Sequence, residues 1–184
     1  MHTDEMWQLY YGNGEPISGM GWQSARDNPE GSDTEIVGAA VVFVFRRNHE
    51  GVLELLWQKR SEGVSRYPGF YDISAGGHIN LGETFVEAAV REAHEEIGAE
   101  ISPSELNLVS MLEQNKNRFA WIYAVDWTLK QEDFKFNDKE VEEVRWVPFD
   151  LTADFVEKYV KPSLKKDKLT FETLEVWFKN HGYL

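Results

Sequence analysis

The pattern of apolar and polar positions divides the chain into a β-rich first part, one amphipathic helix and a mixed second part. Residues 36–45 are almost continuously apolar and β-branched, which predicts a strand covered on both faces. Residues 52–57 continue as its partner across a turn at 48–51. Further upstream, aromatic and apolar residues flank Gly12-Asn13-Gly14, so we expect a hairpin within residues 5–22 and a polar loop to residue 35.

The amphipathic helix is predicted just after residue 84. Its apolar residues at helical spacing are Val86, Ala89, Val90, Ala93 and Ile97. Thr84 can cap the start of this helix, and Gly98 suits the position just past its end.

Shorter elements are predicted in the second part of the chain. Residues 102–105 have a capping-box arrangement with proline at the first helical position, which indicates one helical turn. The segments read as strands are 106–112, 119–129 and 144–147, and those read as helices are 152–160 and 169–178, with Gly182 just beyond. Strands on both sides of a central helix, followed by a C-terminal helical segment at 150–184, predict an α/β fold with a mixed sheet between helical layers.

Length and charge narrow the range of functions. A chain of 184 residues suits one domain with a proper core, residues 1–184. The net charge of −13 argues against binding to polymeric nucleic acid but leaves room for a small phosphorylated substrate brought in with metal. The chain contains no cysteine, which excludes a disulfide framework and a thiol nucleophile. It shows no signal peptide or apolar run long enough for a membrane span. We therefore expect a cytoplasmic protein without membrane partners, as a monomer or a homodimer.

Residues 77–99 read GHINLGETFVEAAVREAHEEIGA and carry a spaced motif. Its fixed positions are Gly77, Glu83, Arg91, Glu92, Glu95, Glu96 and Gly98. At a usage of roughly 7% per residue type, seven matches at set spacing arise by chance about once in 10⁸ registers. The motif is therefore not a coincidence.

Three carboxylates of this motif share one helix face. Glu92, Glu95 and Glu96 stand at i, i+3 and i+4, and their mutual repulsion destabilises a bare helix. A divalent cation would reverse the sign of that interaction, and carboxylate oxygens suit Mg²⁺ or Mn²⁺. An acidic helix face is more often simply solvated. The fixed glycine and arginine favour the metal.

The motif resembles the Nudix box, and this resemblance implies an α/β/α Nudix sandwich that hydrolyses a diphosphate linkage in a nucleoside diphosphate-X substrate. In that family the box holds divalent metal, which implies Glu92, Glu95, Glu96 and the Gly77 carbonyl as ligands. Glu83 then contributes metal or water contacts. Arg91 would orient the carboxylates of the catalytic site through charge-assisted bonds.

Residues 55–83 resemble more narrowly the Nudix branch related to isopentenyl diphosphate isomerase, whose members also carry an N-terminal hairpin. The isomerase uses a Cys-x-His arrangement just before the box, where this chain has Gly76-Gly77-His78. Because no thiol is present and the hydrolase box is intact, we expect hydrolysis. The isomerase and a catalytically silent nucleotide-binding module are the alternatives.

The hydrolysis requires a general base for the attacking water. Within the box Glu95 or Glu96 could take this role. Many family members draw the base from a loop before a later strand, where Glu140 is our first choice. An exposed acidic turn explains Glu140 equally well.

Substrate contacts are expected from residues between the second strand and the box. Lys59, Arg60 and the nearby Arg66 could reach phosphates, although a solvated strand end also explains them. Tyr71 could stack on a base and His78 could contact phosphate, while core packing is the competing interpretation of both.

The motif does not identify the substrate. The family's cues for ADP-ribose and for dinucleoside polyphosphates, a proline and a tyrosine beyond the box, are absent, since Asn115 and Lys116 occupy that area. The cue for NADH-type substrates is absent too.

Overall fold

The computed structural model describes residues 6–11, 15–22, 36–115, 118–128, 130, 134–137 and 139–184. Its strands are β1 (Trp7–Tyr10), β2 (Pro16–Trp22), β3 (Ile36–Arg47), β4 (Leu53–Arg60), β5 (Tyr71–Asp72), β6 (Ala75–His78), β7 (Asn107–Asn115), β8 (Arg118–Asp126) and β9 (Val141–Pro148). The helices are α1 (Phe85–Ile97), α2 (Thr152–Tyr159), α3 (Pro162–Lys165) and α4 (Lys168–Asn180), with short 3₁₀ turns at Pro103–Glu105 and Phe149–Leu151. None of these helices is long and apolar enough to cross a membrane.

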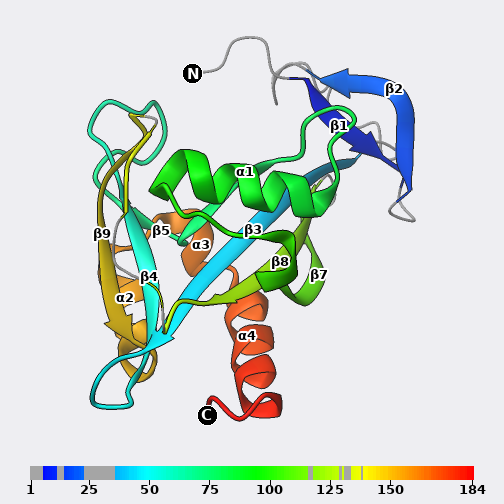
Figure 1. Cartoon of the computed structure of the whole chain (residues 1–184). Helices are drawn as coiled ribbons and strands as arrows, with labels where there is room; N and C mark the ends of the chain where they lie inside the picture. Colours follow the sequence, from blue (N-terminus) through cyan, green and yellow to red (C-terminus); the bar gives the residue numbers. More distant parts are fainter. Residues whose placement is uncertain are drawn as a thin grey trace.

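Strand β3 is the axis of the sheet. Along one edge it pairs in parallel with β8, from Val37 opposite Arg118 to Phe45 opposite Asp126. Its other edge is shared in turn by the antiparallel strands β1, β6 and β4. Strand β4 continues to β5 and β9. The mixed sheet predicted from the sequence is therefore confirmed, and β6 enters it where β3 and β4 diverge (Figure 1).

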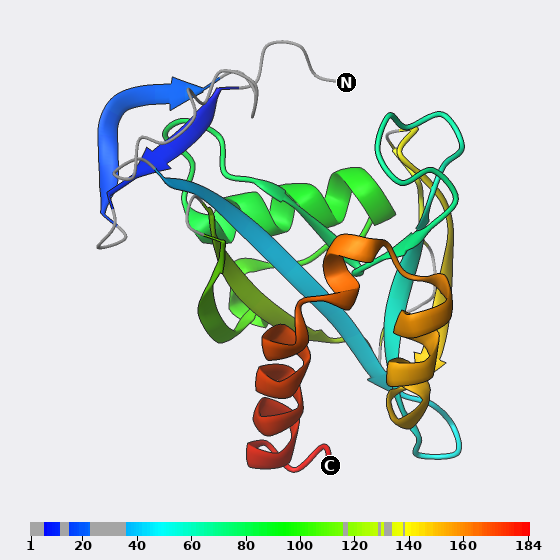
Figure 2. The same cartoon turned by 180° about the vertical axis from the view of Figure 1, so that it is seen from behind.

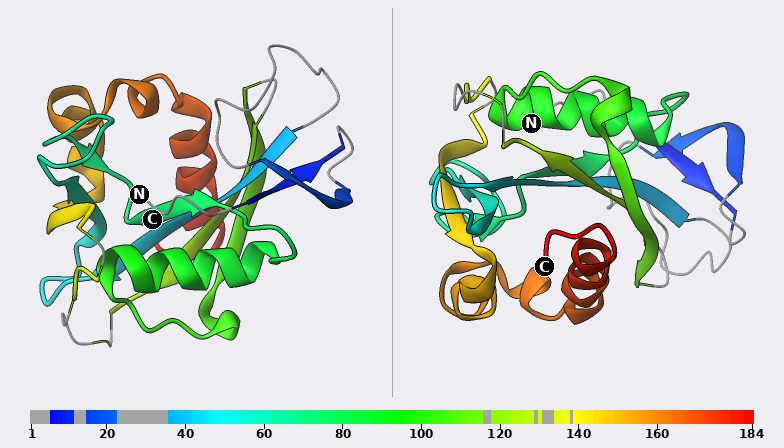
Figure 3. Two further views of the ribbon diagram at one scale, coloured as in Figure 1. Left: turned by 90° about the horizontal axis from the view of Figure 1, so that it is seen from above. Right: turned by 60° about the horizontal axis from the view of Figure 1, so that its bottom comes forward.

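Helices cover both faces of the sheet. Helix α1 lies on one face in Figure 1, and the C-terminal helices lie on the other in Figure 2. The second view of Figure 3 shows the sheet nearly edge-on between these two layers. Side chains of β3 alternate between the two cores: Ala40, Val42 and Val44 pack toward α1, whereas Val41, Phe43 and Phe45 pack toward α2–α4. The α/β/α sandwich expected for the chain is present.

The start and end of α1 are those that the sequence predicts. Thr84 accepts from Glu87 N, and the Glu87 side chain accepts in return from Thr84 N, which completes a capping box. Gly98 adopts the left-handed conformation with φ 64° and ends the helix. The helical turn after residue 102 is also confirmed, as a 3₁₀ turn with Pro103 in its first position.

The other predicted elements are present with shifted ends. The strand expected at 119–129 ends at Asp126, and the later helices run from Thr152 to Tyr159 and from Lys168 to Asn180. Strands β1 and β2 form the predicted hairpin, while its turn at 12–14 and the loop at 23–35 lie outside the described residues. The sequence did not predict β5, β6 or α3, which are too short for a periodic signal.

The hairpin docks on β3 at a glycine. Leu9 pairs with Val37, and Tyr10 packs its ring beside Gly38 and Trp121. A Cβ on Gly38 would lie 2.6 Å from Tyr10 Cε2 and 2.8 Å from Ile79 Cδ1. Only a residue without a side chain lets these groups meet.

We predict that Gly38→Ala lowers the free energy of unfolding by about 1–3 kcal/mol, the usual cost of overpacking a core. Urea unfolding followed by tryptophan fluorescence measures the change. Gly63→Ala is the matched control, because its Cβ would lie 3.8 Å from the nearest neighbour, Ser61 Oγ. Equal stability of the Gly38 variant and the wild type would show that the hairpin does not dock as described.

Candidate active site

The loop 79–84 and the start of α1 position the box residues. Glu83 accepts from the backbone N–H of Asn80 at 2.9 Å, and the N–H of Glu83 donates to the Asn80 carbonyl at 2.9 Å. These bonds close a tight loop before Thr84 caps the helix. The loop brings the Glu83 carboxylate, the one box carboxylate that precedes α1, against Arg91, which lies on α1 itself.

Arg91 is the centre of the site. Its guanidinium makes a two-point contact with Glu83, through Nε at 2.8 Å and Nη2 at 2.9 Å. Nη1 donates to Glu92 at 2.8 Å and to Glu95 at 3.1 Å, and Nη2 also donates to the His78 carbonyl at 2.9 Å. Burial opposes the charged form of Arg91, but the bonds to Glu83 and the charge of Glu92 outweigh it and raise the pKa of Arg91. The predicted orienting contacts are present in this arrangement.

Glu92 faces the loop glycine. A Cβ on Gly77 would lie 2.1 Å from Glu92 Oε1, so no larger residue fits at position 77 while Glu92 keeps this position. The carboxylate of Glu92 and the backbone of Gly77 are therefore direct neighbours. Both were predicted as metal ligands from the box.

Glu96 is held apart from this cluster. It is buried, with 6% of its surface exposed, and its Oε2 accepts from Gln58 Nε2 at 3.0 Å and from Gly76 N at 2.8 Å. Gln58 and the Gly76 N–H were missed from the sequence. A glutamine directly after the apolar residues Leu55, Leu56 and Trp57 is the signal that could have indicated a buried polar contact.

The donor chemistry of these residues fits a hard divalent cation. In the described part of the chain, no three His, Cys, Asp or Glu side chains converge as ready metal ligands. Glu92 and Glu95 instead both bind Arg91 Nη1, and Glu92 lies beside the backbone of Gly77. Carboxylate and carbonyl oxygens are the donors that Mg²⁺ and Mn²⁺ prefer.

The structure places the predicted loop base beside β4. Glu140 forms an ion pair of 3.8 Å with Arg60, and its carbonyl accepts from Ser61 N at 2.8 Å. Arg60 also lies 3.7 Å from Asp72. Lys59, which precedes Arg60 on β4, forms a separate ion pair of 3.4 Å with Glu142.

Tyr71 and His78 have packing roles in the structure. Tyr71 is 5% exposed, contacts Phe155 edge to face and donates its hydroxyl to Glu143. The His78 ring stacks on Trp7 with 3.7 Å between ring centroids. Burial and the guanidinium of Arg118, with smaller contributions from Arg66 and Arg91, lower the pKa of His78 to about 3. The ring is therefore neutral near pH 7, and contact with substrate through either side chain stays a prediction.

The backbone around Gly76 bears on the isomerase alternative. A Cβ at this position would lie 2.8 Å from the Ala40 carbonyl oxygen and 3.0 Å from Ile73 Cδ1. Strand β6 would have to move away from β3 to accept any side chain there. A thiol at the position that the isomerase uses does not fit this backbone.

Comparisons with known proteins identify the family of this chain. The model of the NUDIX domain matches residues 35–166, which include the whole box and most of the sheet. The chain belongs to the Nudix family. The uncharacterized Nudix hydrolase YfcD of Escherichia coli strain K12 is 31% identical over 135 residues, which are 73% of this chain and 69% of that protein.

Two further similarities concern extent and fold. Nudix hydrolase 3 of Arabidopsis thaliana is 30% identical over 120 residues, 59% of this chain but only 16% of that longer protein. The crystal structure of DR0079 from Deinococcus radiodurans superposes with a TM-score of 0.67 at 22% identity and covers 88% of this chain and 96% of that chain. The last similarity shows a common fold. The narrower branch related to isopentenyl diphosphate isomerase stays a prediction.

We predict that Arg91→Met lowers the free energy of unfolding by about 2–3 kcal/mol in metal-free buffer, because partly buried carboxylates lose their shared counter-charge. Urea unfolding with a chelator present measures the loss. Arg145→Met is the control: this side chain is 52% exposed and lies 3.5 Å from Glu143, so its removal should cost at most about 1 kcal/mol. Equal losses in both variants would refute the central role of Arg91.

Proposed function

We propose that the protein is a divalent-metal-dependent hydrolase that cleaves the diphosphate linkage of a small nucleoside diphosphate-X substrate by attack of water. The carrying observation is the gathering of Glu83, Glu92 and Glu95 around Arg91 in the middle of α1, with Glu92 beside Gly77. Membership of the Nudix family supports hydrolysis of this kind of bond. The metal and the substrate class are the parts that require experiment.

The ligands proposed for the metal are Glu92, Glu95, Glu96 and the carbonyl of Gly77. A bound Mg²⁺ or Mn²⁺ would neutralise diphosphate oxygens and lower the pKa of a bound water. Arg91 donates hydrogen bonds to Glu92 and Glu95 and so fixes their carboxylates. Gln58 and the Gly76 N–H orient Glu96.

The general base is proposed to be Glu140, with Glu96 as the alternative within the box. The side chain of Glu140 is 44% exposed and is therefore accessible to water. Its ion pair with Arg60 connects the loop to Asp72 on β5. Arg60 is therefore the most suitable of the predicted phosphate contacts to act together with the base.

Metal binding is tested by calorimetric titration of Mn²⁺ and Mg²⁺ into the protein. We expect Glu95→Gln and Glu96→Gln each to weaken binding at least about tenfold, because each removes a charged oxygen ligand. Glu100→Gln, just beyond the helix and with a side chain that is 87% exposed, is the control and should bind like the wild type. Unchanged affinity in both box variants would refute the ligand assignment.

Catalysis is tested by phosphate release in the presence of Mg²⁺, first in a screen of nucleoside di- and triphosphates, sugar nucleotides and prenyl diphosphates. On the best substrate, Glu140→Gln should lower kcat about 10² to 10⁴-fold and leave metal affinity nearly unchanged, as expected on removal of a base.

Glu142→Gln, two residues along and paired with Lys59, is the matched control and should keep turnover close to that of the wild type. Full activity of Glu140→Gln would place the base inside the box. If Glu96→Gln also kept full activity, the scheme of water attack with these bases would be wrong.

A further inference from the structure

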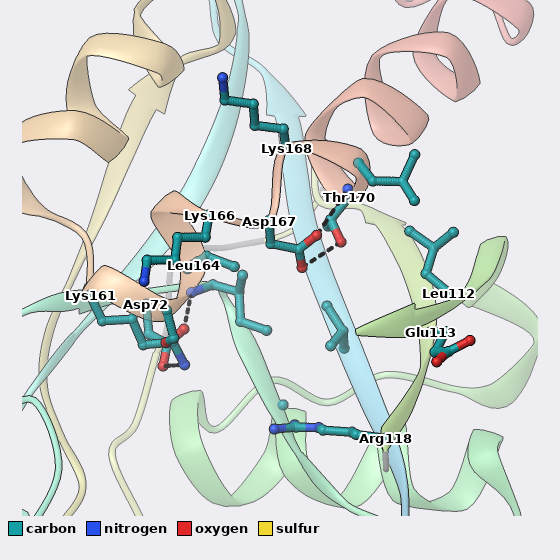
Figure 4. Close-up of a pocket in the computed structure, with 15 residues that line it drawn as sticks. Asp72, Leu112, Glu113, Arg118, Lys161, Leu164, Lys166, Asp167, Lys168 and Thr170 are labelled. Carbon is teal, nitrogen blue, oxygen red and sulfur yellow. Dashed lines mark hydrogen bonds and ion pairs between the residues drawn. The ribbon is translucent and has the colours of Figure 1, made fainter. Parts of the chain in front are cut away.

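A second site lies on the face of the sheet opposite α1. It is a pocket of about 480 Å³ between the sheet and the α3–α4 segment (Figure 4). Its size is that of a small-molecule site. The sheet contributes Val41, Gly76, Leu112 and Arg118, and the C-terminal segment contributes Lys161 and Lys166 among others.

Arg118 is the unusual residue of this pocket. It enters from the start of β8 and extends along the floor (Figure 4). Its Nε is completely buried without a hydrogen-bond partner, and no ion pair joins it to a carboxylate in the described part of the chain. A buried donor of this kind costs free energy unless something binds it. Burial lowers the pKa of Arg118, and the negative charges of Asp72 and Asp167 only partly offset this effect.

Two of the three acidic side chains that line the pocket, Asp72 and Asp167, are bound to other groups, and the third, Glu113, is exposed. Asp72 accepts from Lys161 and lies 3.7 Å from Arg60. Asp167 caps α4 by accepting from Thr170 N at 3.3 Å and from Thr170 Oγ1 at 2.8 Å. Figure 4 shows the contacts of Asp72 with Lys161 and of Asp167 with Thr170 as dashed lines, away from the Arg118 side chain. Neither carboxylate forms an ion pair with Arg118 among the described residues, although the charges of both favour its cationic form.

The basic residues around the pocket favour an anion. Arg118, Lys161, Lys166 and Lys168 all line it, in a chain whose net charge is −13. The guanidinium offers a fork of donors that matches a phosphate group, and ammonium groups nearby add to the attraction.

The pocket and the box share one strand. Gly76 lines the pocket, yet its N–H donates to Glu96 on α1. Gly76 is therefore a neighbour of both the pocket and the box carboxylate Glu96.

From these observations we infer that the pocket binds the part of the substrate beyond the scissile diphosphate, and that Arg118 pairs there with a second phosphate group. The identification of the ligand as substrate rests on the proposed function. The anion site itself rests only on Arg118 and the pocket. Arg118 is thus a specificity-determining residue, which favours substrates that carry a phosphate monoester in addition to the cleaved linkage.

The anion site is tested with inorganic phosphate as the probe, titrated calorimetrically into the full chain in chelator without metal. Arg118→Met should bind phosphate at least about tenfold more weakly than the wild type. Lys179→Gln removes the same charge from the far end of α4, where the lysine pairs with Glu175, and should bind normally. Equal affinity of Arg118→Met and wild type, or an equal loss in Lys179→Gln, would overturn the inference.

Thermal melting shows whether Arg118→Met folds. Without phosphate its Tm should equal or exceed that of the wild type, because a buried unpaired donor is removed; phosphate should raise the Tm of the wild type alone. If the methionine variant does not fold, Arg118→Lys keeps the charge but loses the forked donors, and it should still weaken phosphate binding. In the unsubstituted protein, phosphate should shift the NMR resonance of the Arg118 Nε–H, and no shift would count against the site.

The role in specificity is tested with pairs of nucleoside diphosphate-X compounds that differ by one phosphate monoester. Arg118→Met should lower kcat/KM at least about tenfold for the phosphorylated member and leave the other nearly unchanged. Equal losses for both members would remove the specificity role. Glu95→Gln separates the two proposals, since it should abolish hydrolysis and keep phosphate binding. Phosphate binding without any metal-dependent hydrolysis would refute the proposed function and leave the anion site intact.

Discussion

The burial of β3 on both faces is the constraint on which the rest of the structure depends. From Ile36 to Phe45 every residue of this strand is buried, and alternate side chains belong to different cores. Because the strand pairs with β8 along one edge, its other edge is available to β1, β6 and β4 in succession. The short β6 is thereby held between the two helical layers. The box and the pocket consequently lie on opposite faces of the sheet at β6.

A buried hydroxyl stabilises the point where β3 and β4 diverge. Ser74 is fully buried, accepts from Val44 N at 2.9 Å and donates to the Leu56 carbonyl at 2.6 Å. It substitutes for the direct ladder bonds that the two strands cannot make there. This substitution allows β6 to enter the sheet, with Gly76 and Gly77 at the positions where side chains would collide with Ala40 and Glu92. Packing therefore requires glycine both at position 76 and at the motif position 77.

The two sites handle charge in opposite ways. In the box, the repulsion between carboxylates is relieved by Arg91, so acidic groups are kept close together at low cost. In the pocket, Arg118 Nε is buried without a hydrogen-bond partner. Evenly compensated charge stabilises a fold, whereas a buried group without compensation indicates a site that is completed by a ligand. The contrast is the physical reason to treat the pocket as functional.

Periodicity and spacing alone were sufficient for the long elements and for the box. The apolar run at 36–45, the helical spacing after Thr84 and the fixed motif from Gly77 to Gly98 predicted β3, α1 and the family, because these are local signals repeated over many residues. The tertiary structure alone decided that β6 forms, since a four-residue strand with two glycines exists only through its pairing with β3. It also decided that Gln58 holds Glu96, that Tyr71 is in the core and that Arg118 is enclosed. Burial and counter-charge at these positions come from segments far apart in the chain, and a linear pattern does not record which segments meet.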